Sequence, residues 1–456
     1  MTNALITIVS FLVTVGVLVV VHEFGHYLAA RLVGVKILRF SVGFGKPLVI
    51  RRKGRDQTEW VLSAVPLGGY VKMLDEREGE VAPAELKRAF NRQTVRARMV
   101  IVLAGPMANF FLAFLVYWAL FVGGLPGVKP VVGDPPRDSP AAAAGLQNGD
   151  TLVAIAEEPV ATWTDVRWLL LKEAVKRETT LIEVETDRGT HATRRIDMSA
   201  LSKDDLDKDF LAKLGLRPFR PRTPAVLGRI LPSSAAARAG LVAGDRVVAI
   251  GAKPIATWFD FTGEVTANPG RTLLVDIERG GRRFQLRATP DPVGEGDSRI
   301  GRLGVEAPDE LKREYERMTT TVRYGPVAAV PRAAHKVFDL SIFSVKMLGR
   351  MVVGDVSWKN ISGPITIADY AGQSAQLGWI SWLGFLALVS VSLGVLNLLP
   401  IPLLDGGHLV YYFAEIVKGS PVSERTMEIG QRFGLALLLG LTFFAFYNDI
   451  NRLFTG

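Results

Sequence analysis

The sequence predicts a multidomain membrane protein, with a polytopic α-helical membrane core of four transmembrane helices and two inserted α+β domains. Three observations lead to this fold class. Hydrophobic residues make up 48% of the 456 residues and charged residues still make up 22%, a balance typical of membrane segments joined to water-exposed domains. Four apolar stretches approach the length that crosses a bilayer. Between the second and the third of them, one sequence pattern occurs twice.

The four apolar stretches are the candidate transmembrane helices. They run from about Leu5 to Ala30, from about Met99 to Val122, from about Leu377 to Leu399 and from about Phe433 to Tyr447. The last is short for a membrane span. The first could be a signal peptide, but no basic residue precedes it and it contains His22, Glu23 and His26. These features favour a helix that stays in the membrane.

The placement of Lys and Arg predicts the orientation in the membrane. The loop between the first two stretches carries Arg31, Lys36, Arg39, Lys46, Arg51, Arg52, Lys53, Arg55, Lys87, Arg88, Arg92, Arg96 and Arg98. Because cytoplasmic loops are enriched in basic residues, we expect this loop and the loop around Asp405 in the cytoplasm. The segment from about Pro126 to Met318 and both termini are then expected outside. This placement accounts for much of the net charge of +9 without a nucleic-acid partner.

The long outer segment contains an internal repeat. Ser139 to Asp165 and Ser234 to Asp260 share Ala-Gly-Leu, Gly-Asp, Val-Ala-Ile and Ala-Thr-Trp at a constant offset of 95 residues, which suits two copies of a small domain. Alternating runs such as Val247–Ile250 are typical of strands. The pattern resembles PDZ domains of bacterial proteases, which bind extended peptides at a sheet edge. Two structural modules without a ligand are the alternative.

The first apolar stretch contains the motif His22-Glu23-Phe24-Gly25-His26. On a helix, residues four apart lie on one face, so the two imidazoles could share one Zn²⁺ ion. Glu23 lies about 100° round the helix from His22, where it could take a proton from an attacking water molecule. Ionisable residues inside a membrane helix are costly and mark functional sites by default.

A catalytic zinc ion usually has three protein ligands and one open position. The chain has no Cys, so a thiolate is excluded. Asp405 lies in an apolar context, where prolines and glycines break the helix at the expected cytoplasmic end of the third stretch. Asp405 is the favoured third ligand and His408 the second choice. His191 lies in the outer segment, and His335 lies where we expect the membrane surface.

The motif around His22, the motif Asn397-x-x-Pro-x-Pro-x-x-Asp405-Gly and the tandem PDZ-like repeats together resemble the site-2 protease family of intramembrane metalloproteases. The resemblance covers essentially the whole chain. It implies zinc ligands at His22, His26 and Asp405, Glu23 as catalytic base, and a substrate-holding role for Asn397.

The family resemblance also implies an activity, a cofactor and a location. The enzyme would be a zinc-dependent endopeptidase with one zinc ion per chain, making the second cut of regulated intramembrane proteolysis. Its substrate would be a transmembrane protein such as an anti-sigma factor, or signal-peptide remnants. Its setting would be the lipid bilayer of a bacterial inner membrane, with the active site near the cytoplasm and the PDZ-like domains in the periplasm.

Two further stretches have competing interpretations. Phe40–Gly45 and Pro66–Val71 are rich in glycine and β-forming residues, and they resemble the re-entrant β-loop of the family. An edge there could pair with an unwound substrate strand, which makes Gly43, Phe44 and Gly45 candidate substrate contacts. An ordinary cytoplasmic hairpin is the alternative. His335 to Val353 is amphipathic and could form an interfacial helix or a brace packed on the membrane core.

The expected division of the chain follows these features. It comprises 1–125 (two transmembrane helices and the β-loop), 126–220 (first PDZ-like domain), 221–310 (second PDZ-like domain), 311–375 (amphipathic membrane-surface segment) and 376–456 (two transmembrane helices with the second motif). The repeats could bind peptide termini or exclude substrates with bulky outer domains, and we favour exclusion. Two other functions are disfavoured. Intact Glu23 and Asp405 argue against an inactive scaffold, and the apolar second and fourth stretches argue against a zinc transporter.

Overall fold

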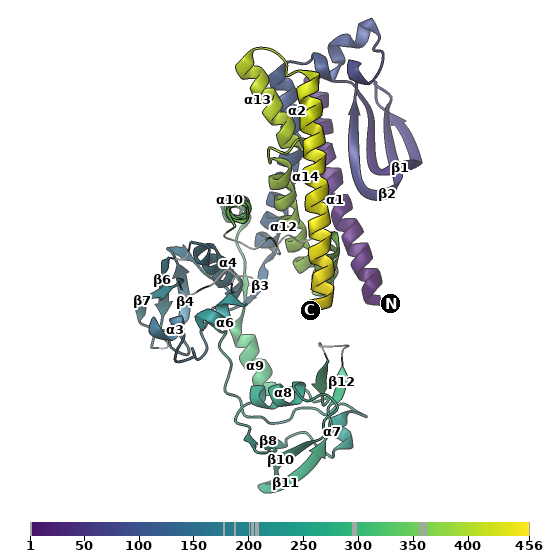
Figure 1. Ribbon diagram of the computed structural model, residues 1–456. Helices are drawn as coiled ribbons and strands as arrows, with labels where there is room; N and C mark the ends of the chain where they lie inside the picture. The colour runs from purple at the N-terminus through teal and green to yellow at the C-terminus, as the bar shows by residue number, and fades with distance from the viewer. Residues whose placement is uncertain are drawn as a thin grey trace. The chain divides into compact units, whose positions relative to one another are not determined.

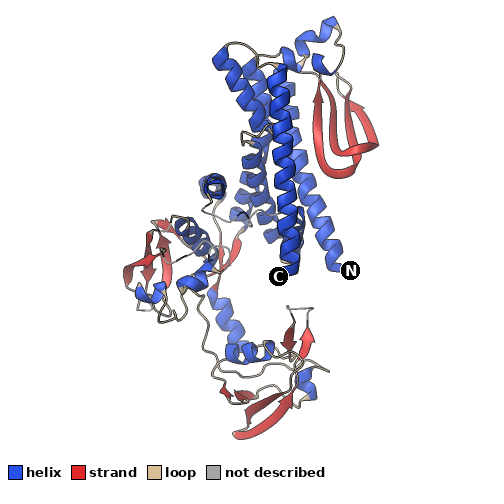
Figure 2. Cartoon of the chain, in the orientation of Figure 1, coloured by secondary structure: helices blue, strands red, loops and turns tan. Residues whose placement is uncertain are grey.

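The computed structural model describes all residues except 1, 177, 187, 200, 202–204, 206–208, 294–298, 355–357, 359–362 and 456. It divides into two compact units. The helical unit comprises Met1–Leu125 and Arg323–Thr455, and the inserted unit is Pro126–Val322. Long helices dominate the helical unit, whereas the inserted unit mixes short strands and helices (Figure 2).

The helical unit consists of long helices and one pair of long strands. Its elements are α1 (Thr2–Val33), β1 (Ile37–Lys53), β2 (Thr58–Met73), the short 3-10 helices η1 (Glu76–Glu78), η2 (Pro83–Arg88) and η3 (Phe90–Arg92), α2 (Val95–Gly123), α10 (Pro326–Val353), α11 (Pro364–Gln376), α12 (Trp379–Asn397), α13 (Asp405–Lys418) and α14 (Glu424–Thr455). Within the described residues, four helices are long and apolar enough to cross a membrane by length and composition.

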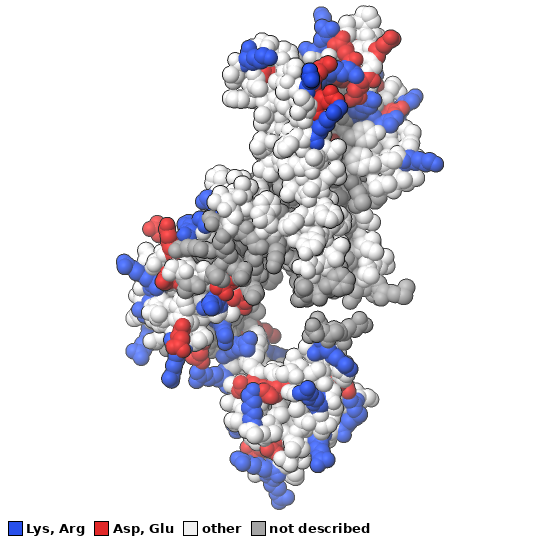
Figure 3. Space-filling model, viewed as in Figure 1, with Lys and Arg blue, Asp and Glu red and all other residues white. Residues whose placement is uncertain are grey.

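These four candidate spans are Ala4–Val33, Val95–Gly123, Trp379–Asn397 and Glu424–Asn451. α1 begins and α14 ends at the same end of the unit, as an even number of crossings requires (Figure 1). On the face shown in Figure 3, charged side chains gather at the end that holds η1, η2 and η3, and the helices below show a broad uncharged surface. That distribution is typical of helices surrounded by lipid.

Several helix boundaries differ from the sequence prediction, and the largest difference is at the start of α14. α14 begins at Glu424 rather than near Phe433, because its first turns carry charged residues that hydropathy leaves out of an apolar stretch. The fourth span predicted from sequence was therefore too short. α12 begins at Trp379 rather than Leu377. Gly378, with a φ of 114°, separates it from α11.

The chain breaks between α12 and α13. The two prolines of this loop cannot donate backbone hydrogen bonds, and Leu403 has a φ of 88°, which is unfavourable for a residue with a side chain. A side chain at Gly406 or Gly407 would collide with carbonyl oxygens of the same loop. The glycines therefore let the loop fold tightly against the start of α13, whose first residue is Asp405.

β1 and β2 form a sheet that is four segments wide. Arg39–Val42 has partners on both sides, in Glu59–Leu62 and in Gly69–Lys72. The second half of β1, Pro47–Lys53, pairs with Thr58–Ser63. Gly69–Lys72 therefore lies at one edge of the sheet and Pro47–Lys53 at the other.

The sheet lies beside α1 (Figure 1). Aromatic residues join them: the ring of Tyr27 on α1 packs 5.8 Å from Phe40 and 5.1 Å from Trp60, centroid to centroid. A side chain at Gly69 would meet Val19 and Glu23 of α1. The edge at Gly69 therefore approaches α1 closely next to the predicted catalytic motif.

Among its described residues, the inserted unit contains two four-stranded sheets, the strand pairs β12-β13 and β3-β14, and several short helices. Its elements are β3 (Leu125–Val128), α3 (Pro140–Ala143), β4 (Thr151–Ile155), β5 (Glu158–Pro159), α4 (Trp163–Ala174), β6 (Thr179–Glu185), β7 (His191–Asp197), α6 (Phe210–Leu214), α7 (Ala235–Arg238), β8 (Arg246–Ile250), β9 (Lys253–Pro254), α8 (Trp258–Thr266), β10 (Leu273–Arg279), β11 (Arg282–Ala288), β12 (Asp291–Val293), β13 (Ile300–Arg302), α9 (Asp309–Met318) and β14 (Thr319–Val322). One sheet has the order β5-β4-β6-β7 and the other β9-β8-β10-β11. The order is the same in both, so the two sequence copies have the same arrangement of strands.

Matching local contacts support this equivalence. Thr162 and Asp165 form a capping box at the start of α4, and Thr257 and Asp260 form the same box at the start of α8. Each copy also has its own buried core. Leu311 of α9 belongs to the core of the second copy, which is why the inserted unit continues past residue 310, where the sequence placed its end.

α10 has both properties that the sequence left open. α10 packs on α2 and α12. Its buried residues include Ala329, Ala333, Val337 and Leu340. On other faces Phe338, Ile342, Val345 and Val352 are exposed. The helix therefore braces the core and also presents apolar side chains outward.

Candidate metal centre

Three polar side chains from opposite ends of the sequence meet in the helical unit. His22 and His26 lie one turn apart on α1, and Asp405 begins α13. His22 Nε2 lies 3.2 Å from His26 Nε2 and 3.2 Å from Asp405 Oδ2, and His26 Nε2 lies 3.5 Å from Asp405 Oδ1. We call these three residues the His–Asp cluster. Among the groups of described residues that could hold a metal ion, the His–Asp cluster is the one that combines residues of the His22 motif and the Asp405 motif.

The His–Asp cluster fits a tetrahedral zinc ion. Ligand atoms at 2.0–2.2 Å from zinc lie roughly 3.3–3.6 Å from one another in a tetrahedron, close to the separations seen here. His26 Nδ1 lies 2.8 Å from the carbonyl oxygen of Ile101. With a proton on Nδ1 donated to that oxygen, Nε2 keeps a lone pair for a metal.

Gly105 of α2 makes room for the two imidazoles. A side chain at this position would collide with His26 Nε2 and crowd His22 Cε1. At this position α2 therefore presents only its backbone to the two rings, and a residue larger than glycine at position 105 would displace them.

Glu23 lies beside the His–Asp cluster without being part of it. Its carboxylate lies close enough to His22, His26 and Asp405 to interact electrostatically with all three, and it lies near the backbone of Val71 on β2. Glu23, His26 and Asp405 all line the same cavity of about 730 Å³. A carboxylate next to a metal position and open to a cavity can accept a proton from water.

Part of the cavity wall is charged. Asp75, Arg77, Arg98 and Glu415 contribute to its lining. Arg98 and Glu415 pair at 2.8 Å and are mostly buried. Water can therefore enter next to a site that lies within membrane-length helices.

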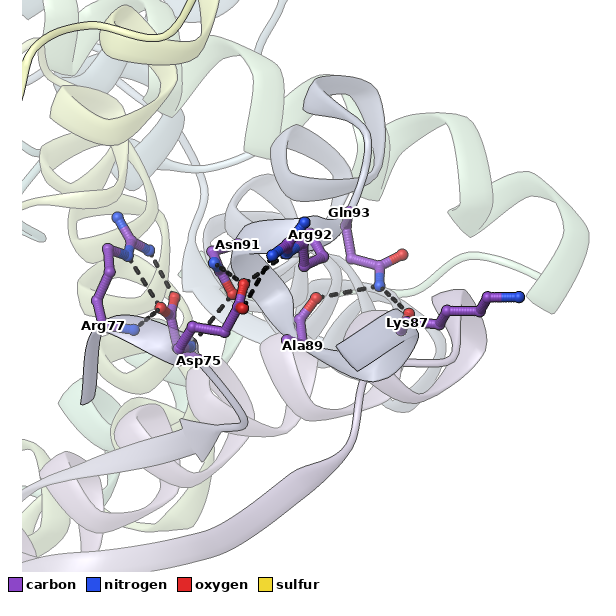
Figure 4. A network of polar contacts seen from close by, with 8 residues as sticks. Asp75, Arg77, Lys87, Ala89, Asn91, Arg92 and Gln93 are labelled. Atoms are coloured by element: carbon purple, nitrogen blue, oxygen red, sulfur yellow. Dashed lines mark hydrogen bonds and ion pairs between the residues drawn. The ribbon is translucent and has the colours of Figure 1, made fainter. Parts of the chain in front are cut away.

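A network of polar contacts holds the segment that lines this wall (Figure 4). Asp75 accepts hydrogen bonds from the backbone and side chain of Arg77. Burial alone would raise the pKa of the Asp75 carboxyl, but these hydrogen bonds outweigh it and lower the pKa. Asn91 and Arg92 both donate to Glu76. Hydrogen bonds therefore connect the short helices η1 and η3 beside the cavity.

The remaining candidate ligands lie elsewhere. His408 lines the cavity one turn after Asp405 but is not in the His–Asp cluster. Burial lowers the pKa of its imidazole. His191 begins β7 in the inserted unit, and His335 lies on α10. Asn397, at the end of α12, places its Nδ2 atom 3.5 Å from His22 Nδ1 and is half-buried.

The candidate substrate contacts of the β-loop lie near the bend of β1. Gly43 and Gly45 have φ angles of 91° and 86°, in the region that favours glycine. Phe44 is 45% exposed and its ring stacks on Tyr70, with centroids 6.3 Å apart. The cavity is lined instead by the edge of β2, at Val71, Lys72 and Met73.

Sequence reasoning missed two residues of α2, Gly105 and Asn109. Asn109 is fully buried, and its Nδ2 atom lies 3.2 Å from His22 Nδ1. The available signal was a lone amide within an apolar helix, because polar residues in membrane helices usually face a functional interior. From its hydropathy, this stretch was predicted to be nearly without polar residues.

The sequence of this chain is similar to those of known proteases over nearly its whole length. Residues 10–441 match the model of peptidase family M50. The chain is 42% identical to the regulator of sigma-E protease of Salmonella typhimurium, over 99% of this chain and 100% of that protein. It is 41% identical to the regulator of sigma-E protease of Escherichia coli, over 97% and 98%. It is 43% identical to a putative zinc metalloprotease of Neisseria meningitidis, over 98% and 99%. The chain therefore belongs to peptidase family M50, the site-2 protease family.

Proposed function

We propose that this protein is a zinc-dependent intramembrane endopeptidase of site-2 protease type. The observation that carries the proposal is the His–Asp cluster, with Glu23 beside it, in a unit of membrane-length helices. His22, His26 and Asp405 are the zinc ligands and Glu23 is the catalytic base. One zinc ion per chain is expected, because this one cluster joins both sequence motifs.

The roles of the residues follow from their positions. Bound zinc supplies a Lewis acid that polarises the scissile carbonyl and acidifies a nearby water molecule. Glu23 accepts one proton as the water oxygen attacks the carbonyl carbon. It then delivers that proton to the departing amine nitrogen as the C–N bond breaks. Asp405 and the two imidazoles keep the reacting groups fixed relative to Glu23.

A helical substrate must unwind before it can be cut, because its carbonyls are held in hydrogen bonds. The edge of β2 at Gly69–Met73 lies next to Glu23 and lines the cavity. An unwound substrate segment can add there as a further strand. Gly43, Phe44 and Gly45 shape the bend of the same sheet, and Asn397 holds the substrate near the metal.

The β-loop presents apolar residues to its surroundings. Leu48, Val49, Ile50 and Leu62 are each about half exposed. Exposed apolar residues on neighbouring segments of one sheet favour a lipid setting over water. They support a re-entrant loop in preference to a cytoplasmic hairpin.

The substrate and location follow from the relatives, two of which are named as regulators of sigma-E. We infer a transmembrane substrate such as an anti-sigma factor, cut second in regulated intramembrane proteolysis. Signal-peptide remnants are a second substrate class. The setting is a bacterial inner membrane, with the basic loop and active site toward the cytoplasm and the PDZ-like repeats in the periplasm.

The proposed chemistry can be tested by replacing only the base. The full chain in lipid nanodiscs is given a single-span substrate, and zinc content and cleavage rate are both measured. Glu23→Gln should keep wild-type zinc and cleave about 10²–10⁴-fold more slowly. Glu80→Gln, at an exposed position, is the matched control and should cleave normally. Zinc-loaded Glu23→Gln with near wild-type turnover would contradict the assignment.

The task of the repeats can be tested on the intact enzyme through the substrate. Exclusion by size predicts that cleavage falls as the outer domain of the substrate grows, whatever residues end a trimmed substrate. Capture of a carboxyl terminus predicts that the terminal residues matter at constant size. We expect the first pattern, and rates that depend on the terminal residues alone would replace exclusion with capture.

A further inference from the structure

We propose that Asn109 sets the tautomer of His22. The Asn109 side-chain oxygen accepts the proton on His22 Nδ1, which leaves the lone pair of Nε2 free for zinc. Asn109 is thus a positioning residue that acts through His22. The proposal rests on the zinc site proposed above.

The geometry around Asn109 leaves one polar atom unsatisfied. The residue is 0% exposed, and its side-chain nitrogen lies 3.2 Å from His22 Nδ1. Its Oδ1 atom is buried and has no hydrogen-bond partner among the described residues. Buried polar atoms are nearly always paired, so this oxygen calls for a donor.

The chemistry of a metal ligand supplies that donor. A neutral imidazole carries one proton. His22 Nε2 faces Asp405 and His26, so binding a metal there requires the proton to be on Nδ1. An amide nitrogen cannot accept that proton, whereas an amide oxygen can. The two orientations of an Asn amide have almost the same shape, so turning the Asn109 amide by 180° pairs the orphaned oxygen with the Nδ1 proton.

His26 shows the same arrangement with a backbone partner. Its Nδ1 atom lies 2.8 Å from the carbonyl oxygen of Ile101. Ile101 and Asn109 both belong to α2, and Gly105 lies halfway between them. One face of α2 therefore offers an acceptor to each imidazole and the space that both rings need. Such outer partners fix the orientation of metal-binding histidines.

A hydrogen bond from α12 fixes the backbone of α2 at Asn109. The hydroxyl of Ser390 on α12 donates to the backbone oxygen of Asn109 at 2.7 Å, and Ser390 is fully buried. The amide can turn while the backbone stays fixed. The Asn109 side chain therefore has a defined position relative to His22.

The proposal also separates the roles of two asparagines. The Nδ2 atom of Asn397 lies 3.5 Å from His22 Nδ1, but a single N–H proton cannot serve both residues well. Asn109 is closer and fully buried, whereas Asn397 is half-buried. Asn397 is therefore left free to contact the substrate.

The test compares acceptor-only and apolar replacements at position 109 in the full-length protein. Zinc affinity is measured by competition with a chromogenic chelator, and the Co²⁺ spectrum reports the ligand geometry. Asn109→Leu should weaken zinc binding about 10–100-fold. Asn109→Asp keeps an oxygen acceptor and should restore affinity to within a few fold of wild type. Asn397→Leu should leave zinc affinity unchanged and slow only cleavage.

Two results would overturn the inference. One is a folded Asn109→Leu protein with wild-type zinc affinity. The other is an equal loss in the Asp and Leu variants, which would indicate a packing role. Asn109→Ala serves as a second variant if the Leu protein fails to fold, with size-exclusion behaviour as the check. Wild-type protein that binds no zinc would instead overturn the proposed function itself.

Discussion

The two repeats of the inserted unit and the candidate metal centre are built in opposite ways. In the repeats the same local contacts occur twice at an offset of 95 residues, such as the capping boxes of Thr162 and Thr257. In the metal centre, His22 and Asp405 meet across most of the chain. Local structure can be copied as a block, whereas the site depends on the packing of several helices. Mutations should therefore act locally in the repeats and globally at the metal centre.

The sharpest test of this difference is the loss of a single distant ligand. Asp405→Ala removes an oxygen of the His–Asp cluster, so zinc content should fall from about one per chain to near zero and cleavage should cease. Metal analysis of the purified protein and a cleavage assay measure both. Asp260→Ala, a carboxylate of the second repeat, is the control and should keep full zinc. An Asp405→Ala protein with full zinc and activity would remove Asp405 from the ligand set.

A smaller effect is expected where α2 passes the imidazoles. A methyl group at Gly105 would collide with His26 and crowd His22, so Gly105→Ala should weaken zinc binding at least about tenfold. Gly123→Ala is the matched control, because the same helix has open space at Gly123. Chelator competition measures both variants. Equal zinc affinities in the two would mean that the rings do not depend on the closeness of α2.

The repeats should differ from each other at one buried acid. The Asp245 side chain is fully buried and pairs with Arg279 at 2.7 Å. By strand register, Thr186 occupies the place of Arg279 in the first repeat. Arg279→Met would leave a buried carboxylate without its partner, destabilising the second repeat by about 1–3 kcal/mol.

Hydrogen exchange of the full chain can detect this change. Amides of β8 and β10 should exchange faster in Arg279→Met, while those of β4 and β6 and the zinc content stay as in wild type. Faster exchange in both repeats would show that the two copies are coupled rather than independent.

The smallest expected effect concerns the matched helix caps. Thr162→Ala and Thr257→Ala each remove a side chain that accepts a hydrogen bond from the third helical residue. Each should destabilise its own helix by about 1 kcal/mol. Exchange of α4 and α8 measures the two effects separately. A large difference between the destabilisation of α4 and that of α8 would mean that the same capping box does not contribute equally to the stability of the two helices.

These contrasts explain what could be predicted from the sequence. His22 and His26 are four residues apart on one helix, and the strands of the repeats follow from alternating side chains. The helical unit, the repeat and the family were therefore predictable and are confirmed. PDZ-like binding and the assignment of zinc ligands stay predictions.

The residues that were missed share one physical cause. Gly105 and Asn109 matter only because α2 packs against α1 at one rotation and one height, and no pattern within α2 encodes its partner. The start of α14 was missed for a related reason. Its charged turns border the aqueous cavity, where Glu424 and Glu428 contribute to the lining, so hydropathy alone could not assign them to a long helix.

The placement of the inserted unit between the proposed ligands has a consequence for chain entropy. A metal held by α1 and α13 closes a loop that contains the whole of Pro126–Val322. The unit roughly doubles the length of that loop. Because closure entropy grows only with the logarithm of loop length, each doubling costs about 0.6 kcal/mol. Whole domains can therefore be added to or removed from this part of the chain with little change in the free energy of assembling the metal centre.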